Sequence, residues 1–262
     1  KGGLAVGFDL CPLCRVVALV VPIDAPGATG QPPAAERARR VAAALGAEAW
    51  DVPFAEAQHT GAAALNEELR ALILAREAEG ARWRNPSPSM RISRELYESD
   101  FNFFAWPESC VQQLREFCWS AMSRLIAQLN GYNAELMGQL AIHSHTWFHV
   151  TRAGGYFGLH NHPMASWSGV YCVTPGEDDP EHPDSGQLCF NNPNQIAYMY
   201  VDPANNHMRA PYTMNGKTYR LRAGQLVLFP SWVSHEVLPY RGRGERITVA
   251  FNCWFRLPEQ GG

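Results

Sequence analysis

The second half of this chain breaks into short apolar runs separated by turn residues, and this pattern restricts the fold more than any other feature. From about Leu140 onward, runs such as "HTWFHVTR", "WSGVYCVT" and "YRLRAGQLVLFP" are separated by Gly, Pro, Asn and Asp. Runs of strand length with frequent turn signals predict antiparallel strands arranged as a sandwich or small barrel.

The first half of the chain has helical spacing instead. Residues 107–133, "PESCVQQLREFCWSAMSRLIAQLNGYN", repeat apolar side chains every three or four positions, and Asn130-Gly131 predicts the end of that helix. A second helix is predicted over residues 59–80, with Thr60 as its cap. A strand and an alanine-rich helix are predicted before it, within residues 1–60.

Helices that precede strands predict an α+β chain. We expect three parts: an N-terminal extension over residues 1–60, a helical support layer over 61–139, and a strand-rich core over 140–262.

The composition excludes several classes of function. The net charge is −3, and no basic stripe suggests nucleic acid or an anionic membrane as a partner. The longest apolar run, "VVALVVPI" at residues 16–23, is far shorter than the roughly 18 residues of a membrane span. Seven cysteines are an odd and sparse set, which favours a reducing cytoplasm over a disulfide scaffold. Cys11 and Cys14 form one CxxC pair without a second half, so an incidental pair is the simplest interpretation.

The segment "GLHNHPMASWSG" places two histidines one residue apart, His160 and His162. Side chains at positions i and i+2 of a strand point to the same side, so the two imidazoles suit a metal ion. His235, in "GQLVLFPSWVSHEV", is the candidate third ligand. A histidine pair on one strand and a single histidine on a later strand is the layout of a metal site in a double-stranded β-helix.

The glycine spacing around these histidines also fits the cupin pattern. Gly154 precedes His160 by six positions, and Gly224 is followed by Pro230 and then His235. The glutamate that cupins usually carry after the histidine pair is absent, since Ser166 and Trp167 stand there.

Several linked motifs carry a closer resemblance. The chain contains "HNHP", "SGVYCV", "GQLCFNNP", "GQLVLFPSWVSHEVLP" and "ERITVAFN" in that order. This set resembles a group of iron(II)/2-oxoglutarate-dependent oxygenases, over roughly residues 65–255 and more weakly in the first half. The resemblance implies a double-stranded β-helix (jelly-roll or cupin-like) core with an N-terminal helical layer. It also implies Fe(II) as the metal, 2-oxoglutarate as co-substrate and O2 as oxidant.

The same resemblance assigns two further residues. Arg246 follows His235 by eleven positions, and Thr248 lies on the same side of the expected strand. In such oxygenases an arginine at this place grips the far carboxylate of 2-oxoglutarate, and a nearby hydroxyl assists. A guanidinium suits this task because it binds a carboxylate through two parallel hydrogen bonds. The alternative is an ion pair between Arg246 and the acidic loop "GEDDPEHPD".

Most enzymes of this class use two histidines and one carboxylate, and His162 stands at the carboxylate position. Three neutral ligands change the preference among metals, so copper stays open beside iron. With histidine at the carboxylate position, the use of 2-oxoglutarate as co-substrate stays open.

Four other residues are candidates for the pocket wall or for support of the metal ligands: His149, Tyr156, Trp167 and Asn252. The segment "HSHTWFH", residues 143–149, contains a second set of alternating histidines. We expect this segment to border the same barrel and not to bind a second metal ion.

The leading hypothesis is a 2-oxoglutarate-dependent oxygenase that hydroxylates or otherwise oxidises a C–H bond of a small-molecule or peptide substrate. One alternative is a three-histidine iron or copper oxygenase or oxidase without 2-oxoglutarate, in which Arg246 holds the substrate. The other is a non-catalytic cupin-like binding module. A homodimer is an option that the sequence does not decide.

Overall fold

The computed structural model describes residues 52–88, 93–193, 200–209, 212–213 and 215–257. The strand and helix predicted in the N-terminal extension, and the Cys11/Cys14 pair, lie outside these residues. The described elements are β1 (Ala55–Gln58), α2 (Ala62–Ala78), η1 (Gly80–Arg82), β2 (Leu96–Glu98), η2 (Phe103–Ala105), α3 (Ser109–Asn130), α4 (Ala134–Gln139), β3 (Ala141–Thr151), β4 (Phe157–His160), β5 (Trp167–Thr174), β6 (Leu188–Phe190), β7 (Lys217–Tyr219), β8 (Gln225–Pro230), β9 (His235–Val237) and β10 (Arg246–Arg256).

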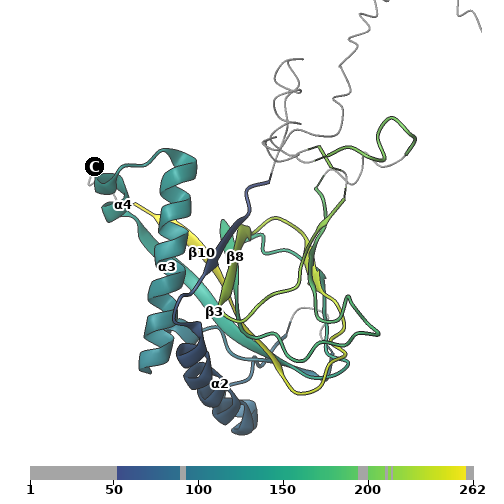
Figure 1. Ribbon diagram of the computed structural model, residues 1–262. Coiled ribbons are helices and arrows are strands. Elements are labelled where there is room, and N and C mark those ends of the chain that lie inside the picture. Colours follow the sequence, from purple (N-terminus) through teal and green to yellow (C-terminus); the bar gives the residue numbers. More distant parts are fainter. Residues whose placement is uncertain (1–51, 89–92, 194–199, 210–211, 214, 258–262) are drawn as a thin grey trace, which may run out of the picture.

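Two antiparallel sheets face each other and enclose the interior of a barrel (Figure 1). The large sheet has the order β1-β8-β5-β10-β3-β2, and the small sheet has the order β4-β9-β6-β7. Neighbours in each sheet are far apart in sequence, since β10 lies between β3 and β5. This is the double-stranded β-helix with a helical layer that the sequence predicted.

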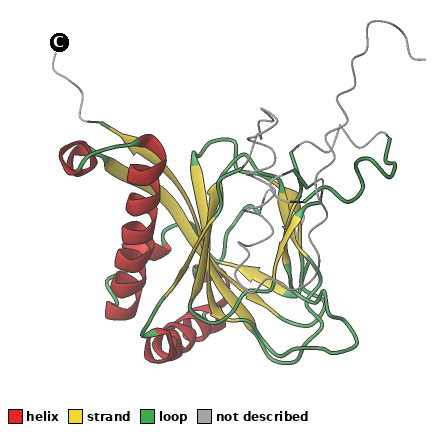
Figure 2. Ribbon diagram, turned by 45° about the horizontal axis from the view of Figure 1, so that its top comes forward, coloured by secondary structure: helices red, strands yellow, loops and turns green. Residues whose placement is uncertain are grey.

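Helices α2 and α3 cover the outer face of the large sheet (Figure 2). The predicted apolar face of α3 is buried there, including Val111, Leu114, Cys118 and Met122. Leu129 shares that spacing but is 47% exposed, because it lies in the last turn of the helix. Gly131 ends α3 with a φ of 68°, as the Asn-Gly pair predicted.

Strand β10 separates two environments by simple alternation. Ile247, Val249 and Phe251 point outward into the core under the helices. Arg246, Thr248, Ala250 and Asn252 point inward and line a pocket. A second apolar cluster fills another part of the interior and consists of Cys172, Leu188, Phe190, Tyr219, Leu221, Val227, Phe229 and Val233.

Several local expectations need correction. Thr60 does not cap α2: the cap position is Gly61, without a side-chain capping hydrogen bond, and Gly61 N–H donates instead to His59 Nδ1. Strand β2 was not predicted, because residues 82–107 show neither helical nor strand periodicity and were interpreted as loop and short turns; β2 pairs with β3. Helix α4 and strand β4 are additional elements, and Asn133 caps α4 by accepting from Leu136 N–H.

Candidate metal centre and pocket

The three predicted metal ligands lie together at one end of the small sheet. His160 ends β4 and His235 begins β9, and the two are direct cross-strand partners. Their ring centroids are 4.2 Å apart, and the ring of His162 lies 4.9 Å and 5.2 Å from the other two. His162 follows β4 by two residues, and its N–H donates to Ser231 O at 2.8 Å. One ligand atom from each histidine lies within 4.8 Å of the others.

Backbone hydrogen bonds orient two of these imidazoles. His160 Nδ1 donates to Gly158 O at 2.8 Å, and His235 Nδ1 donates to Val233 O at 2.9 Å. Because a carbonyl oxygen only accepts, each ring carries its proton on Nδ1 and keeps the lone pair on Nε2. This is the arrangement by which proteins prepare histidine as a metal ligand.

Burial keeps these histidines neutral. It lowers the pKa of His162 to about 3 and that of His235 to about 3, and the neighbouring His160 adds to both shifts. The pKa of His160 is lowered for the same principal reason. Neutral imidazoles are the form that binds metals, so the site needs no proton release before an ion enters.

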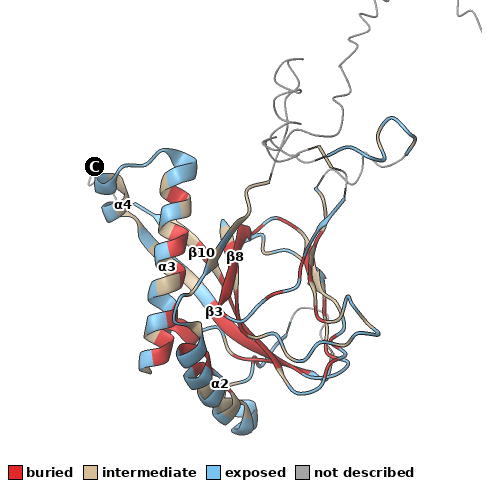
Figure 3. Cartoon of the chain, in the orientation of Figure 1, coloured by how far each residue is buried: buried red, intermediate tan, exposed pale blue. Residues whose placement is uncertain are grey.

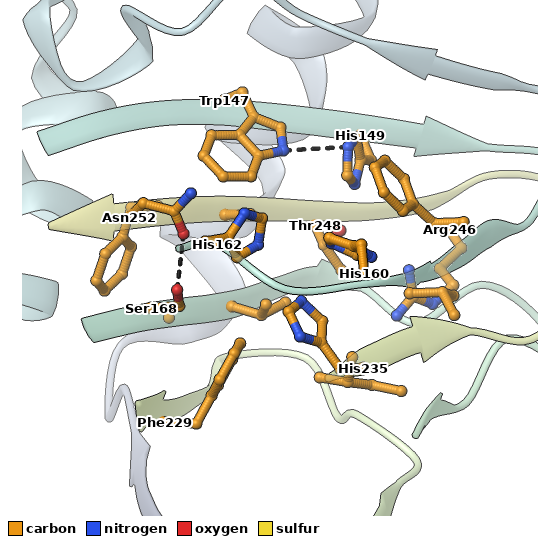
Figure 4. Close-up of a pocket in the computed structure, with 17 residues that line it drawn as sticks. Trp147, His149, His160, His162, Ser168, Phe229, His235, Arg246, Thr248 and Asn252 are labelled. Carbon is orange, nitrogen blue, oxygen red and sulfur yellow. Dashed lines mark hydrogen bonds between the residues drawn. The ribbon is translucent and has the colours of Figure 1, made fainter. Parts of the chain in front are cut away.

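Arg246 and Thr248 project from β10 into the same pocket as the three histidines (Figure 4). Arg246 is only 3% exposed and Thr248 only 2%. Among the described residues, no hydrogen bond or ion pair engages the Arg246 guanidinium. Burial lowers the pKa of Arg246, but a guanidinium stays charged in proteins. A buried cation without a partner is costly, which suits a site that receives an anion.

The acidic loop does not supply that anion. Asp178 contacts Arg220, Glu177 lies 3.8 Å from Arg243, and Asp179 contacts His182. The alternative ion pair for Arg246 is therefore not formed by these carboxylates.

A buried carboxylate that the sequence analysis did not single out lies beside the pocket. Glu98, at the end of β2, is within 3.0 Å of His149 Nε2, and Trp147 Nε1 lies 3.1 Å from the same nitrogen. Burial alone would raise the pKa of Glu98, but His149 and the amide of Asn85 together hold it below its ordinary value. Glu98 was missed because it lies in a three-residue strand inside a stretch without periodicity.

The remaining predicted pocket residues divide into two groups. His149 and Asn252 line the pocket, and Asn252 accepts a hydrogen bond from Ser168 Oγ at 2.7 Å. Tyr156 and Trp167 are not among the residues that line it. Trp167 packs instead against the core under the helices. The exposed residues His143 and His145 belong to no cluster of three metal-ligating side chains in the described part of the chain.

A family model and several solved structures resemble this chain. Residues 145–252 match the family described as "Putative 2OG-Fe(II) oxygenase". A search of curated proteins finds no match. None of the helices among the described residues is both long and apolar enough to cross a membrane.

Solved structures share the fold at low sequence identity. The epimerase SnoN from nogalamycin biosynthesis is 12% identical with a TM-score of 0.52, over 87% of this chain and 92% of SnoN. The carbocyclase SnoK of the same biosynthesis is 12% identical with a TM-score of 0.51, over 89% of both chains. A prolyl hydroxylase from Trichoplax adhaerens, solved with a peptide fragment of hypoxia inducible factor, is 15% identical with a TM-score of 0.50, over 84% of this chain and 89% of that one.

Proposed function

We propose that His160, His162 and His235 hold the iron of a non-haem oxygenase, since residues 145–252 match the 2OG-Fe(II) oxygenase family and contain all three histidines. The proposal is supported by three convergent, neutral imidazoles, two of which keep Nε2 free through backbone hydrogen bonds. The substrate that we propose is a small molecule or a peptide whose C–H bond is oxidised.

The single observation that carries the co-substrate assignment is the Arg246 guanidinium, which is buried without a partner among the described residues. Thr248 is its inward neighbour on β10, and both line the pocket that contains the histidines. We assign Arg246 to the distal carboxylate of 2-oxoglutarate and Thr248 Oγ1 to a supporting hydrogen bond. A planar guanidinium can grip that carboxylate through two parallel hydrogen bonds and so fix the direction of the whole molecule.

When bound, Fe(II), 2-oxoglutarate and O2 supply oxidative decarboxylation coupled to C–H oxidation. The chain itself supplies position and shelter. Trp147, Phe157 and Phe229 are apolar walls of the pocket that exclude water from its interior. Asn252 and Ser168 place polar groups at the far end of the pocket from Arg246, where a substrate can be oriented.

The three-histidine set removes one negative charge from the ligands compared with two histidines and a carboxylate. Glu98 keeps a carboxylate close by, and its charge acts on His160 and His162 in the direction that favours their protonated forms. The family match favours 2-oxoglutarate chemistry over the alternatives of an oxidase without 2-oxoglutarate and a non-catalytic module.

The test is the metal content of the purified protein by elemental mass spectrometry, for wild type, His162→Ala and His207→Ala. His207 is exposed and lies outside the cluster, so its variant is the matched control. We expect near-stoichiometric iron in wild type and control, loss of iron in His162→Ala, and succinate formation from 2-oxoglutarate only where iron is retained. Stoichiometric copper, or iron without 2-oxoglutarate consumption, would replace this function by the oxidase. The absence of metal even after anaerobic reconstitution would leave the non-catalytic module.

A further inference from the structure

A row of aromatic and imidazole rings leads out of the pocket along β3 and β10. Trp147 lies 5.9 Å from His162, and Phe101 lies 5.3 Å from Trp147. Further along the row, the ring centroids of Phe101 and His145 are 6.2 Å apart, those of His145 and Trp254 are 5.2 Å apart, and those of Trp254 and His143 are 6.0 Å apart. We call Phe101, His143, His145 and Trp254 the ring row. It joins the metal centre to the surface.

The ring row lies where the two longest strands extend past the barrel. β3 and β10 pair along all eleven residues, whereas β5 pairs with β10 only as far as Cys253. Burial along β3 changes from exposed and intermediate at Ala141–His145 to fully buried from Thr146 onward (Figure 3). Helices α3 and α4 lie against this end of the sheet on its outer side, where Met137, Ile142 and Phe255 pack on the core. The ring row is on the other face.

The edge of β3 beside the ring row has no strand partner among the described residues. Thr146 N–H donates to Phe101 O, and Phe148 O accepts from Ser99 N–H, so even-numbered residues point their backbone groups away from β10. Ile142 and Ser144 share this orientation because hydrogen-bonding direction alternates along a strand. Within the described part of the chain, no hydrogen bond engages their N–H or C=O groups. Free edges of this kind pair readily with another extended segment.

We propose that an extended peptide segment of a substrate protein adds to the free edge of β3 at residues 141–145 and lays alternate side chains over the ring row. Its continuing chain then reaches the pocket past Phe101 and Trp147. A strand-like peptide fits because it satisfies the free backbone groups of Ile142 and Ser144. Its alternate side chains, roughly 6.6 Å apart, then project on the face that carries His143 and His145, which continues through Trp147 to the pocket.

The side-chain chemistry of the peptide follows from the surface. The ring row offers Phe, Trp and imidazole faces, which favour aromatic or aliphatic side chains at alternate positions. Arg256, which lies on the same face of β10 one step beyond Trp254, is exposed and has no ion pair among the described residues. An acidic residue at that end of the peptide would complement it. This proposal rests on the proposed function, because it names the substrate class of the same site.

The experiment measures binding of fluorescein-labelled ten-residue peptides by anisotropy to the full chain loaded with Ni(II) and 2-oxoglutarate. The probe peptide alternates phenylalanine with serine and ends in two aspartates. The control peptide has the same composition with its phenylalanines in one block. We expect the alternating peptide to bind at least about tenfold more tightly, and to slow amide exchange at Ile142 and Ser144.

Two variant pairs locate the binding. Ser144→Pro removes an N–H that faces the free edge, so the β3–β10 ladder loses no hydrogen bond while strand addition is blocked. We expect it to weaken binding at least about tenfold, whereas Ser144→Ala binds as wild type. Trp254→Ala should weaken binding to a similar extent, whereas Trp232→Ala, an exposed tryptophan outside the ring row, should not.

Failure of this proposal is distinguishable from failure of the proposed function. Equal affinity for the two peptides, or unchanged binding by Ser144→Pro, would overturn the docking of a peptide at this edge. A dimer in light scattering that Ser144→Pro converts to a monomer would also overturn it and assign the edge to a second copy of the chain. Neither result affects iron content or succinate formation. Loss of Ni(II) binding in wild type would instead contradict the proposed function.

Discussion

At the residue scale, we expect Arg246 to lower the stability of the fold and, as proposed, to bind 2-oxoglutarate. Its guanidinium is buried without a partner among the described residues, in a strand whose alternate side chains are apolar. In other proteins, replacement of buried ion pairs by apolar residues of similar volume stabilises the fold by about 1–4 kcal/mol, because it removes the desolvation cost of the charges.

We therefore expect Arg246→Met to raise the free energy of unfolding by about 1–3 kcal/mol in the absence of 2-oxoglutarate. The same variant should lose 2-oxoglutarate binding while it retains the metal. Urea unfolding and isothermal titration with 2-oxoglutarate measure the two effects. A variant that is less stable than wild type and still binds 2-oxoglutarate would contradict the assignment of Arg246.

The pKa values of the histidines predict how the metal-free protein responds to acid. His162 and His235 titrate near pH 3 when folded and near 6.5 when unfolded. Between these values the unfolded state binds more protons, so stability falls as the pH is lowered through this window. Each group contributes up to about 1.4 kcal/mol per pH unit.

With a chelator present, we expect wild type to lose stability steeply from pH 6.5 to pH 5. His162→Gln with His235→Gln should flatten that dependence, because both titrating groups are gone. Denaturant unfolding at several pH values gives the two slopes. Parallel slopes would show that these histidines are not held neutral by the fold.

At the scale of elements, two glycines near helix ends differ in backbone conformation. Gly131 ends α3 with a φ of 68°, a conformation that costs other residues about 1 kcal/mol or more, whereas Gly138 in α4 has no positive φ. A Cβ at either position meets nothing within 4 Å. We expect Gly131→Ala to lower stability by about 1 kcal/mol and Gly138→Ala to raise it by up to about 1 kcal/mol. Thermal unfolding of the two variants checks this, and a similar change in both would contradict it.

The sequence predicted long periodic elements well and short ones poorly. Residues 109–130 show six turns of helical spacing, and the strands after Leu140 carry linked motifs, so both were predicted. β2, β4 and α4 were not, because each is only three to six residues long and depends on pairing or packing with distant residues. The structure brings the residues predicted for the site into one pocket, namely His160, His162, His235, Arg246 and Thr248. Glu98 could not be predicted, because its contact with His149 depends on the pairing of β2 with β3.

At the scale of the whole molecule, the proposed ligands connect the two sheets. The histidines belong to or follow strands of the small sheet, whereas Arg246 and Thr248 belong to β10 of the large sheet. A metal ion alone should therefore stabilise the small sheet, and 2-oxoglutarate should couple it to the large one.

Amide hydrogen exchange tests this division. We expect Ni(II) alone to slow exchange mainly around β4 and β9, and Ni(II) with 2-oxoglutarate to slow it in β10 as well. When 2-oxoglutarate is present at one hundred times its dissociation constant, its binding should raise the free energy of unfolding by about 2.7 kcal/mol. Arg246→Met should remove the effect on β10 and leave the effect of Ni(II). Slowed exchange in β10 with Ni(II) alone would contradict the division of ligands between the sheets.

The inward face of β10 runs from Arg246 through Thr248 and Asn252 to Trp254 at its exposed end. The residue proposed to hold 2-oxoglutarate and the residue proposed for peptide contact thus lie at opposite ends of one strand. Under the proposed docking, a substitution near Trp254 changes which segment is selected and leaves the Arg246 end, where the co-substrate is proposed to bind, as it was.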